Sequence, residues 1–438
     1  MLRILALLFI ISSAASAAPS NYLVVAQGND TSGALAAVVA NGGTVVDDLS
    51  AIGAVIATAD NADFAAAVAA SPGVLSADVD PDIQWIPDGE QGTEMFDDPS
   101  AQGVNTEPFA SFQWNLRQIH ADQTAAAGQL GDGAVVAVID TGVNTGHKDL
   151  RDRIDFARSK AFVNSVLFPA FPAYEDDVFH GSHVSCIVAA SINNFGVQGV
   201  APQATIVAIK VLNNKGRGSF GNVIRGIMYA SSLGVDVINM SLGATFDRIN
   251  AGGNGGGGPA NSLGHFLAVL TRAVNHASSA GVLVVSAAGN NGVDLNGRLF
   301  SVPAQSGNGW AVSATGPVGL QNFDRLASYS NFGASVINVA APGGDFTPSL
   351  GANAKFDLVL SCGNRDPAKP ATVVNRFFFA AGTSMATPHV AGVAALLVGK
   401  LGHVGPAHLR ELIGNSAAHV LPTNFEGRGR VDAAAALQ

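Results

Sequence analysis

The sequence of 438 residues has little charge, only two cysteines and no apolar run long enough to cross a bilayer. Two cysteines, Cys186 and Cys362, do not make a disulfide-stapled scaffold or a zinc site, and their spacing does not show whether they pair. Asp, Glu, Lys and Arg make up 13% of the residues, with a formal net charge of -10. Because phosphate contacts need clustered Lys and Arg, this balance argues against a nucleic-acid-binding protein.

Apolar residues and glycine are abundant instead, at 48% of the chain and 51 residues respectively. This composition provides a large buried core with many tight turns, and it excludes a disordered chain. At this length we expect one large domain together with a smaller one.

The first 17 residues are typical of a secretory signal peptide. Arg3 supplies the positive start, residues 4–11 the apolar stretch, and residues 15–17 a small-residue cleavage site. The apolar stretch is well below the roughly 18 to 20 residues of a membrane anchor. We therefore expect an exported protein with no membrane attachment once the signal is removed.

Residues 18–88 alternate apolar runs and helical patterns in the order β-α-β-β-α-β. This order predicts a small α+β unit of the ferredoxin-like type, with its last strand in the run at 74–85. The unit holds no histidine, cysteine or polar cluster, so we expect it to be non-catalytic. Residues 89–108 are acidic and rich in turn formers, which predicts an exposed linker with a processing site.

Residues 109–438 are expected to form the large domain. Alternation of strand and helix patterns predicts an α/β domain with a mainly parallel sheet and helices on both sides, and functional residues at the carboxyl ends of strands. The glycine-rich run at 251–260 lacks the Lys-Ser/Thr pair of a phosphate loop, and we assign it no chemistry. The expected strands are the nearly continuous apolar runs AVVAVID, ATIVAIKVL, VDVINMSL, GVLVVSAAG, GWAVSAT and SVINVAAPG.

Four short segments place reactive side chains at strand ends or helix starts. AVIDTGV holds Asp140, HGSHVSC holds His180, SAAGNNG holds Asn290 and GTSMATPHVAG holds Ser384. Taken singly, each has an ordinary structural explanation, as a turn, a polar helix start, a left-handed turn or a helix N-cap. Taken together, they supply an acid, a base, a neutral donor and a hydroxyl, which favours nucleophilic catalysis.

In this chain order the four segments resemble those of the subtilisin-like serine proteases, the subtilases. The resemblance covers nearly all of the chain and implies a three-layer α/β/α catalytic domain at 109–438, preceded by an inhibitory propeptide at 18–88. It further implies that Ser384 is the nucleophile, that His180 is its general base, and that Asp140 orients His180.

The helix start at the implied nucleophile also carries a proline. Pro388 lacks the N–H that would bond to the carbonyl of Ser384, so the first turn can be irregular while the helix below stays packed. First-turn N–H groups and the helix dipole favour a developing anion at this place. The resemblance implies that the N–H of Ser384 and the side-chain amide of Asn290 hold the oxyanion.

The resemblance also implies where an extended peptide would bind. KGRGSFG matches the family's edge segment, in which Gly216, Arg217 and Gly218 would pair with the substrate. Ala304 is expected near the floor of the main pocket, whose wall would be SLG, although SLG is also typical of a plain turn at a strand end. Arg217 is the one charge in this set and lies on the edge segment, so we expect an uncharged residue before the scissile bond. The SLG residues are Ser241, Leu242 and Gly243.

Two features depart from the family's pattern. In its H-G-T-H-V-A-G motif, Ser182 replaces Thr and Cys186 replaces Gly, and for Cys186 we favour a buried inert thiol over a redox role. The loop SINNFGVQGVAP resembles the family's tight calcium site, with Asp149 and Asn194 as matching ligands, but it is one residue shorter. Since calcium needs about 6 to 8 oxygen ligands, a structural calcium ion stays a hypothesis.

The sequence therefore predicts a secreted serine endopeptidase, extracellular or periplasmic, that is made as an autoprocessed precursor and needs no cofactor for its chemistry. Its expected partners are protein or peptide substrates and its own propeptide, with no nucleic acid and no membrane, and it is expected to be a monomer.

Two other interpretations stay open. The first is a non-catalytic secreted binding protein on the same fold. The second is a secreted esterase of another fold, which would need G-x-S-x-G and the order Ser, Asp, His, whereas the aspartate and histidine here precede Ser384.

Overall fold

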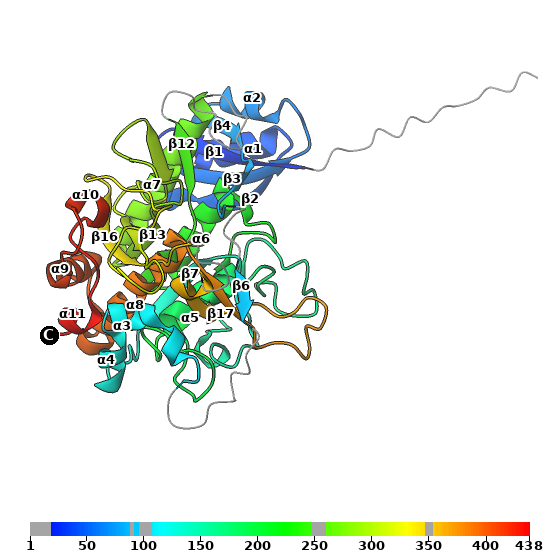
Figure 1. Cartoon of the computed structure of the whole chain (residues 1–438). Coiled ribbons are helices and arrows are strands. Elements are labelled where there is room, and N and C mark those ends of the chain that lie inside the picture. Colours follow the sequence, from blue (N-terminus) through cyan, green and yellow to red (C-terminus); the bar gives the residue numbers. More distant parts are fainter. Residues whose placement is uncertain (1–18, 88–91, 96–106, 248–259, 347–353) are drawn as a thin grey trace, which may run out of the picture. The chain divides into compact units, whose positions relative to one another are not determined.

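The computed structural model describes residues 19–87, 92–95, 107–247, 260–346 and 354–438. The chain divides into two compact units, Met1–Asp80 and Pro81–Gln438 (Figure 1). The expected signal peptide, most of the expected linker and the glycine-rich run lie outside the described residues.

The first unit consists of β1 (Ser20–Ala26), α1 (Ser32–Ala40), β2 (Thr44–Leu49), a 3-10 turn (Ser50–Ile52), β3 (Ala54–Ala59), α2 (Phe64–Ala69) and β4 (Val74–Val79). The β-α-β-β-α-β order expected from the sequence is thereby confirmed. The strands form an antiparallel sheet in the order β2-β3-β1-β4. Valine and alanine side chains of β1 and β3 share one buried cluster with Val38 of α1 and Phe64 of α2, and the rings of Tyr22 and Phe64 lie 4.7 Å apart.

The prediction of one last strand over residues 74–85 is wrong. β4 ends at Val79, and the strand that follows, β5 (Asp82–Gln84), pairs antiparallel with β10 (Arg217–Ser219) in the second unit. Pro81 separates β4 from β5 because it has no N–H for a strand ladder and its φ angle is fixed.

The second unit is built around a seven-stranded sheet in the order β16-β15-β13-β11-β7-β9-β8, and its pairings are parallel. The six apolar runs found in the sequence all form strands of this sheet, so the expected α/β architecture is confirmed. Valine, isoleucine and alanine suit these strands because both faces are covered. The strands are β7 (Val135–Asp140), β8 (Lys160–Ala161), β9 (Thr205–Lys210), β11 (Val237–Met240), β13 (Leu283–Ala287), β15 (Trp310–Thr315) and β16 (Ile337–Pro342).

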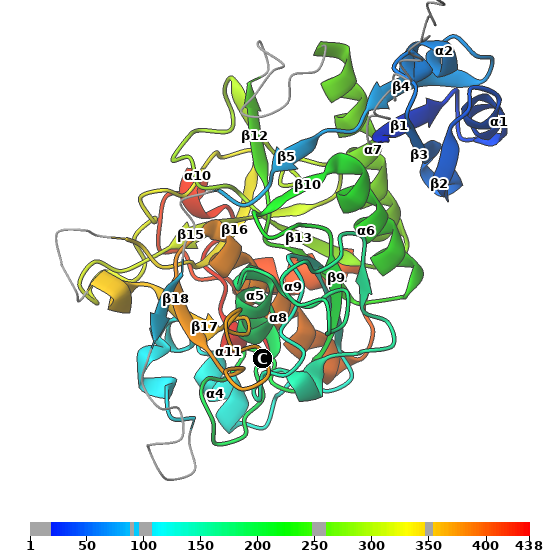
Figure 2. The same ribbon diagram turned by 90° about the vertical axis from the view of Figure 1, so that its right-hand side faces the viewer.

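Four longer helices cover the sheet. α5 (His180–Ala189) packs against α8 (Thr383–Leu401), and α6 (Phe220–Ser232) packs against α7 (Ala260–Ser279). Figure 2 shows these two pairs as separate layers on either side of the strands, which gives the three layers α/β/α. α8 is apolar and long enough to cross a membrane by composition, but it is buried from Thr383 to Val398 and is therefore the central core helix.

The remaining helical segments are short or lie at the rim. They are a 3-10 turn (Ala110–Phe112), α3 (Trp114–Gln118), α4 (Ala121–Ala126), a 3-10 turn (Arg151–Arg153), α9 (Pro406–Ser416), α10 (Thr423–Glu426) and α11 (Ala433–Ala436).

Two further small sheets complete the second unit. β12 (Ala244–Asp247) pairs with β14 (Leu299–Val302), and β17 (Val359–Cys362), β18 (Phe377–Ala380) and β6 (Thr93–Met95) form a three-stranded sheet. β6 falls in the segment expected to be an exposed linker, yet Met95 is buried and Glu94 forms a bidentate ion pair with Arg376. The second unit therefore includes residues well before Phe109, where the sequence places its start.

Candidate active site

The structure brings two of the four reactive side chains into direct contact. Asp140 ends β7 and His180 begins α5, and the Nδ1 of His180 lies 2.8 Å from Oδ1 of Asp140. Both side chains are fully buried. Because the carboxylate accepts a hydrogen bond from the N–H at Nδ1, Nε2 is the basic nitrogen of the ring.

Ser384 lies in the first turn of α8 and is 3% exposed. Pro388 has no N–H to bond to the carbonyl of Ser384, and this carbonyl accepts the hydroxyl of Ser241 instead, at 2.7 Å. The helix can therefore contain a proline below the serine without leaving a buried carbonyl unsatisfied. α5 and α8 pack against each other, so the helices of His180 and Ser384 are neighbours.

Asn290 follows β13 and is oriented by the residue before Ser384. Its Oδ1 accepts two hydrogen bonds from Thr383, from the backbone N–H at 2.9 Å and from the hydroxyl at 2.7 Å. These bonds identify the oxygen end of the amide, so the Nδ2 end is the one that can donate to a substrate oxygen. Gly289 has a φ of 102°, and a Cβ there would lie 2.5 Å from Asn331, which explains the glycine.

Asn290 and Ser384 line the same pocket, which has a volume of about 140 Å³. No lining side chain carries a charge. The lining residues are Gln84, Trp85, Pro87, Gly243, Ala244, Thr245, Ala287, Gly289, Asn290, Asn291, Thr383 and Ser384.

The other implied substrate residues lie at different distances from this pocket. Gly243 lines it, whereas Leu242 is buried and the hydroxyl of Ser241 points to Ser384. Ala304 does not line the pocket among the described residues, and it packs in a separate cluster with Ala288, Leu295 and Ala311. The placement of Ala304 at the pocket floor is therefore not supported by the structure.

An extended segment of the chain itself lies beside the edge segment formed by Gly216, Arg217 and Gly218. The N–H groups of Trp85 and Ile86 lie 3.1 and 3.2 Å from the carbonyl of Gly216, and the carbonyl of Trp85 accepts the N–H of Gly243 at 2.9 Å. Residues 82–87 thus lie as an added strand between the edge segment and SLG. The sequence pattern does not reveal this occupant, because it places these residues in the first unit.

Trp85 anchors this strand. Its side chain is fully buried, Nε1 donates to the carbonyl of Gly218 at 2.9 Å, and its ring meets Phe220 edge-to-face at 5.1 Å. Phe220 in turn stacks with Phe246 and Phe266. The edge segment therefore adjoins a group of aromatic rings that can bind a large apolar side chain.

A buried polar network behind Asp140 and His180 was also missed. Asp176 accepts the hydroxyl of Thr141 at 2.9 Å, and both the N–H and the hydroxyl of Ser182 at 2.9 and 2.6 Å. Burial raises the pKa of Asp176, while the ammonium of Lys210 acts in the opposite direction. Thr141 and Ser182 flank the two reactive residues, and only spatial proximity reveals the network.

His183 is a structural residue and not a second base. It is fully buried, and its Nε2 donates to the carbonyl of Phe378 at 2.9 Å. Burial lowers the pKa of His183 to about 3, so its ring stays neutral at ordinary pH.

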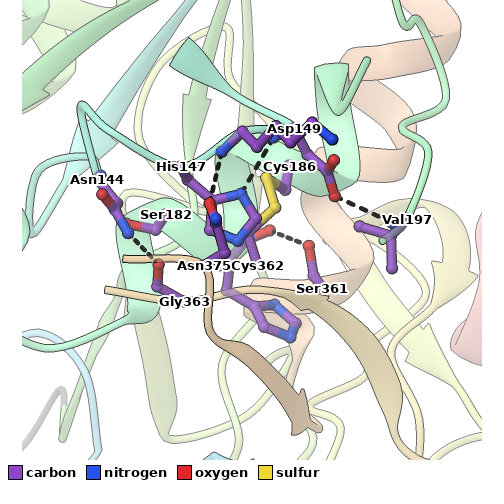
Figure 3. The surroundings of a disulfide bond; sticks show 12 residues. Asn144, His147, Asp149, Ser182, Cys186, Val197, Ser361, Cys362, Gly363 and Asn375 are labelled. Carbon is purple, nitrogen blue, oxygen red and sulfur yellow. Dashed lines mark hydrogen bonds between the residues drawn. A yellow bond between two sulfur atoms is a disulfide. The ribbon is translucent and has the colours of Figure 1, made fainter. Parts of the chain in front are cut away.

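The two cysteines form a disulfide bond, which corrects the expectation of an inert thiol at Cys186. The Cα atoms of Cys186 and Cys362 lie 5.8 Å apart, and the bond ties α5 to β17 (Figure 3). His147 lies close to both sulfur atoms, but sulfurs bonded to each other are not thiolate ligands. Nε2 of His147 also donates to the carbonyl of Arg376 at 3.1 Å, and its Nδ1 accepts the N–H of Asp149 at 3.2 Å.

The residues proposed for calcium do not fit a calcium ion. Asn194 is exposed, with a left-handed φ of 60°. Among the described residues of this loop and its surroundings, Asp149 Oδ1, Ser191 Oγ and Asn193 Oδ1 are the buried side-chain oxygens without a hydrogen-bond partner. Three such oxygens fall well short of the about 6 to 8 that calcium needs. Burial, which has the largest effect, and the nearby carboxylate of Glu107 both raise the pKa of Asp149.

The chain is similar in sequence to known proteins over most of its length. The sequence pattern of the subtilase family matches residues 131–434. The chain is 35% identical over 361 residues to M-protease of Shouchella clausii, over 82% of this chain and 76% of that protein. It is 36% identical over 328 residues to subtilisin BL of Lederbergia lenta, over 75% and 99% of the two chains.

One solved structure extends the likeness to almost the whole chain. The epidermin leader peptide processing serine protease of Staphylococcus aureus matches with a TM-score of 0.74, over 96% of this chain and 98% of that chain. At 23% sequence identity, this match shows the fold alone.

Proposed function

The chain belongs to the subtilase family of serine proteases, and from this membership we propose that it cleaves peptide bonds with the triad Asp140, His180 and Ser384. The observation that carries the proposal is the shared pocket of Ser384 and Asn290, next to the place where the chain's own strand lies. The 2.8 Å contact between Asp140 and His180 supports the same assignment.

The reaction follows from these positions. The hydroxyl of Ser384 attacks the substrate carbonyl while Nε2 of His180 takes its proton, and Asp140 stabilises the imidazolium. The oxyanion accepts hydrogen bonds from Nδ2 of Asn290 and from the N–H of Ser384, which as a first-turn amide has no acceptor within the helix. His180 then returns the proton to the leaving amine, and water hydrolyses the acyl-enzyme by the same steps.

The substrates of this site would be extended peptides with an uncharged residue at the pocket. They would add a strand to β10, as residues 82–87 do, so that backbone hydrogen bonds provide most of the recognition. The uncharged lining of the pocket supports this preference.

The protein would be exported as a precursor. The signal-like first 17 residues support export, and the position of residues 82–87 at the active site supports a first unit that acts as an inhibitory propeptide. We propose that the precursor cuts itself beyond Pro87, that the mature protein keeps β6, and that it acts as a monomer on protein or peptide substrates. The chemistry requires no cofactor, and the acidic chain has no nucleic-acid or membrane partner in this proposal.

The test compares the full precursor with Ser384→Ala and with Ser232→Ala, a matched change at an exposed serine of α6. We expect the parent and Ser232→Ala to shorten to a product whose mass corresponds to an N-terminus no later than Gly92, and to digest casein. Ser384→Ala should stay full-length and inert. If Ser384→Ala still shortens by itself and digests casein, the proposed nucleophile is wrong. If all three proteins stay full-length and inert, the binding-protein interpretation is favoured.

A further inference from the structure

The loop that follows α5, residues 191–199, is held by a carboxylate from another part of the chain. Glu107 is 3% exposed, and three successive backbone N–H groups point to it. Those of Asn193 and Asn194 donate to Oε1 at 2.6 and 2.9 Å, and that of Phe195 donates to Oε2 at 2.8 Å. Successive amides turned toward one point form a site for an anion.

The segment that begins at Glu107 also uses the carbonyl groups of the loop. The N–H of Phe109 donates to the carbonyl of Gly196 at 2.9 Å. Gln113 makes two hydrogen bonds with the backbone of Gln198, from its Nε2 to the carbonyl at 2.7 Å and from the N–H to its Oε1 at 3.1 Å. These two carbonyl oxygens therefore already accept hydrogen bonds from protein donors.

The other side of the loop is packed tightly on Asp149. Oδ2 of Asp149 accepts the N–H of Val197 at 3.0 Å. Gly196, which directly precedes Val197, has a φ of 62°, and a Cβ atom at this residue would lie 2.3 Å from Oδ2 of Asp149. The loop thus presents backbone donors to both carboxylates, whereas a calcium cage needs acceptors turned inward.

A single cation, the exposed Lys148, offsets part of the negative charge of the two carboxylates. The ammonium of Lys148 lies 4.3 Å from the centre of the Phe195 ring, and it acts electrostatically on both Glu107 and Asp149. A bound cation would otherwise supply this positive charge.

We propose that the carboxylate of Glu107 closes this loop in place of a calcium ion, with Lys148 as the positive charge. The backbone N–H groups that Glu107 binds hold the loop in the conformation that packs on Asp149. The loop is then stable without a metal, and its stability depends on the charge of Glu107. This inference concerns folding, so it stands or falls independently of the protease chemistry.

The experiment uses the full chain carrying Ser384→Ala, so that self-digestion does not disturb a melting curve. Thermal unfolding is recorded in excess EDTA and in millimolar calcium chloride for this parent, for Glu107→Gln, and for Glu411→Gln. Glu411 is an exposed glutamate of α9, with 65% of its side chain exposed, and serves as the matched control. The Glu107→Gln change would place an NH₂ group against backbone N–H donors, which leaves buried donors unpaired.

The parent should melt within about 1 °C in the two buffers, because a ligand that does not bind the folded state does not shift its melting. Glu107→Gln should melt about 3 to 6 °C lower in both buffers, and Glu411→Gln should not change. A rise of several degrees for the parent in calcium, lost in Glu107→Gln, would identify Glu107 as a calcium ligand and overturn the proposal. Equal melting of Glu107→Gln and the control would also overturn it. If Glu107→Gln does not fold, the melting temperatures of the parent in EDTA and in calcium chloride alone decide whether the folded loop binds calcium.

Discussion

Replacing both cysteines by alanine should lower the thermal stability of the second unit while leaving its active site assembled. The disulfide joins α5, the helix of His180, to β17. Both sulfur atoms are fully buried, so each replacement also removes packed atoms from the core. The double variant Cys186→Ala/Cys362→Ala therefore loses a cross-link and some packing together.

The magnitude follows from the length of chain that the bond closes. The two cysteines are 176 residues apart in sequence. Closing a loop of this length removes about 5 kcal/mol of chain entropy from the unfolded state at 25 °C, although measured values are often smaller. With about 3 to 5 kcal/mol lost, a unit of this size should melt roughly 4 to 7 °C lower.

Other contacts should keep α5 and the hairpin of β17 and β18 together after the bond is removed. The hydroxyl of Ser361 donates to the carbonyl of His183 at 2.8 Å, and the ring of His183 donates to Phe378 at 2.9 Å. We therefore expect casein digestion at 25 °C to stay within about twofold of the parent, since the hydrogen bonds that hold His180 in place are intact.

Melting curves of the Ser384→Ala background with and without the cysteine replacements provide the assay, and the active forms provide the rates. Each single replacement serves as a control, because it removes the cross-link and leaves one buried thiol. An unchanged melting temperature of the double variant would refute the entropic argument. A large loss of activity in a variant that remains folded at 25 °C would refute the view that the bond acts only on stability.

Two further predictions concern the oxyanion donor and the buried histidines. Asn290→Ala should lower kcat on a peptide substrate about 10²- to 10³-fold with little change in KM. Asn308→Ala, a change at an exposed asparagine, should leave kcat unchanged. An equal loss of kcat in the two variants would contradict the donor role of Asn290. Burial lowers the pKa of His147 and of His183 to about 3, and that of His389 to about 4. Below about pH 6.5 the unfolded chain therefore binds more protons than the folded chain. The free energy of unfolding should fall as the pH decreases from there, by up to about 1.4 kcal/mol per pH unit for each ring. The raised pKa values of Asp149 and Asp176 act in the opposite direction. Melting at pH 7 and pH 5 should therefore show a smaller fall for His183→Gln than for the parent, and an equal fall would contradict this assignment.

The sequence predicts the central sheet well because its strands leave local signals. Strands buried on both faces appear as continuous apolar runs, and Asp140, His180, Asn290 and Ser384 each stand in a short segment at a strand end or helix start.

Other features depend on contacts between distant residues and leave no such signal. Cys186 and Cys362 meet only because α5 packs near β17. Glu107 binds a loop that lies 86 residues further along the chain. β5 and β6 have three residues each, too few for a periodic pattern, so their partners in the second unit determine that they are strands. The prediction of an exposed linker failed at β6 for this reason.

Pro388, in the helix of the proposed nucleophile, connects the local signals with the long-range contacts. From the sequence, Pro388 only permits an irregular first turn, because it cannot bond to the carbonyl of Ser384. In the structure that carbonyl accepts the hydroxyl of Ser241, which is itself bonded to the side chain of Asn239 at 3.0 Å. The missing helical hydrogen bond is thus replaced by one from the end of β11. Because the N–H of Gly243 in the same SLG segment binds the strand at the pocket, Ser384 and the backbone beside the pocket are fixed to each other. The proline that disturbs the helix makes this connection possible.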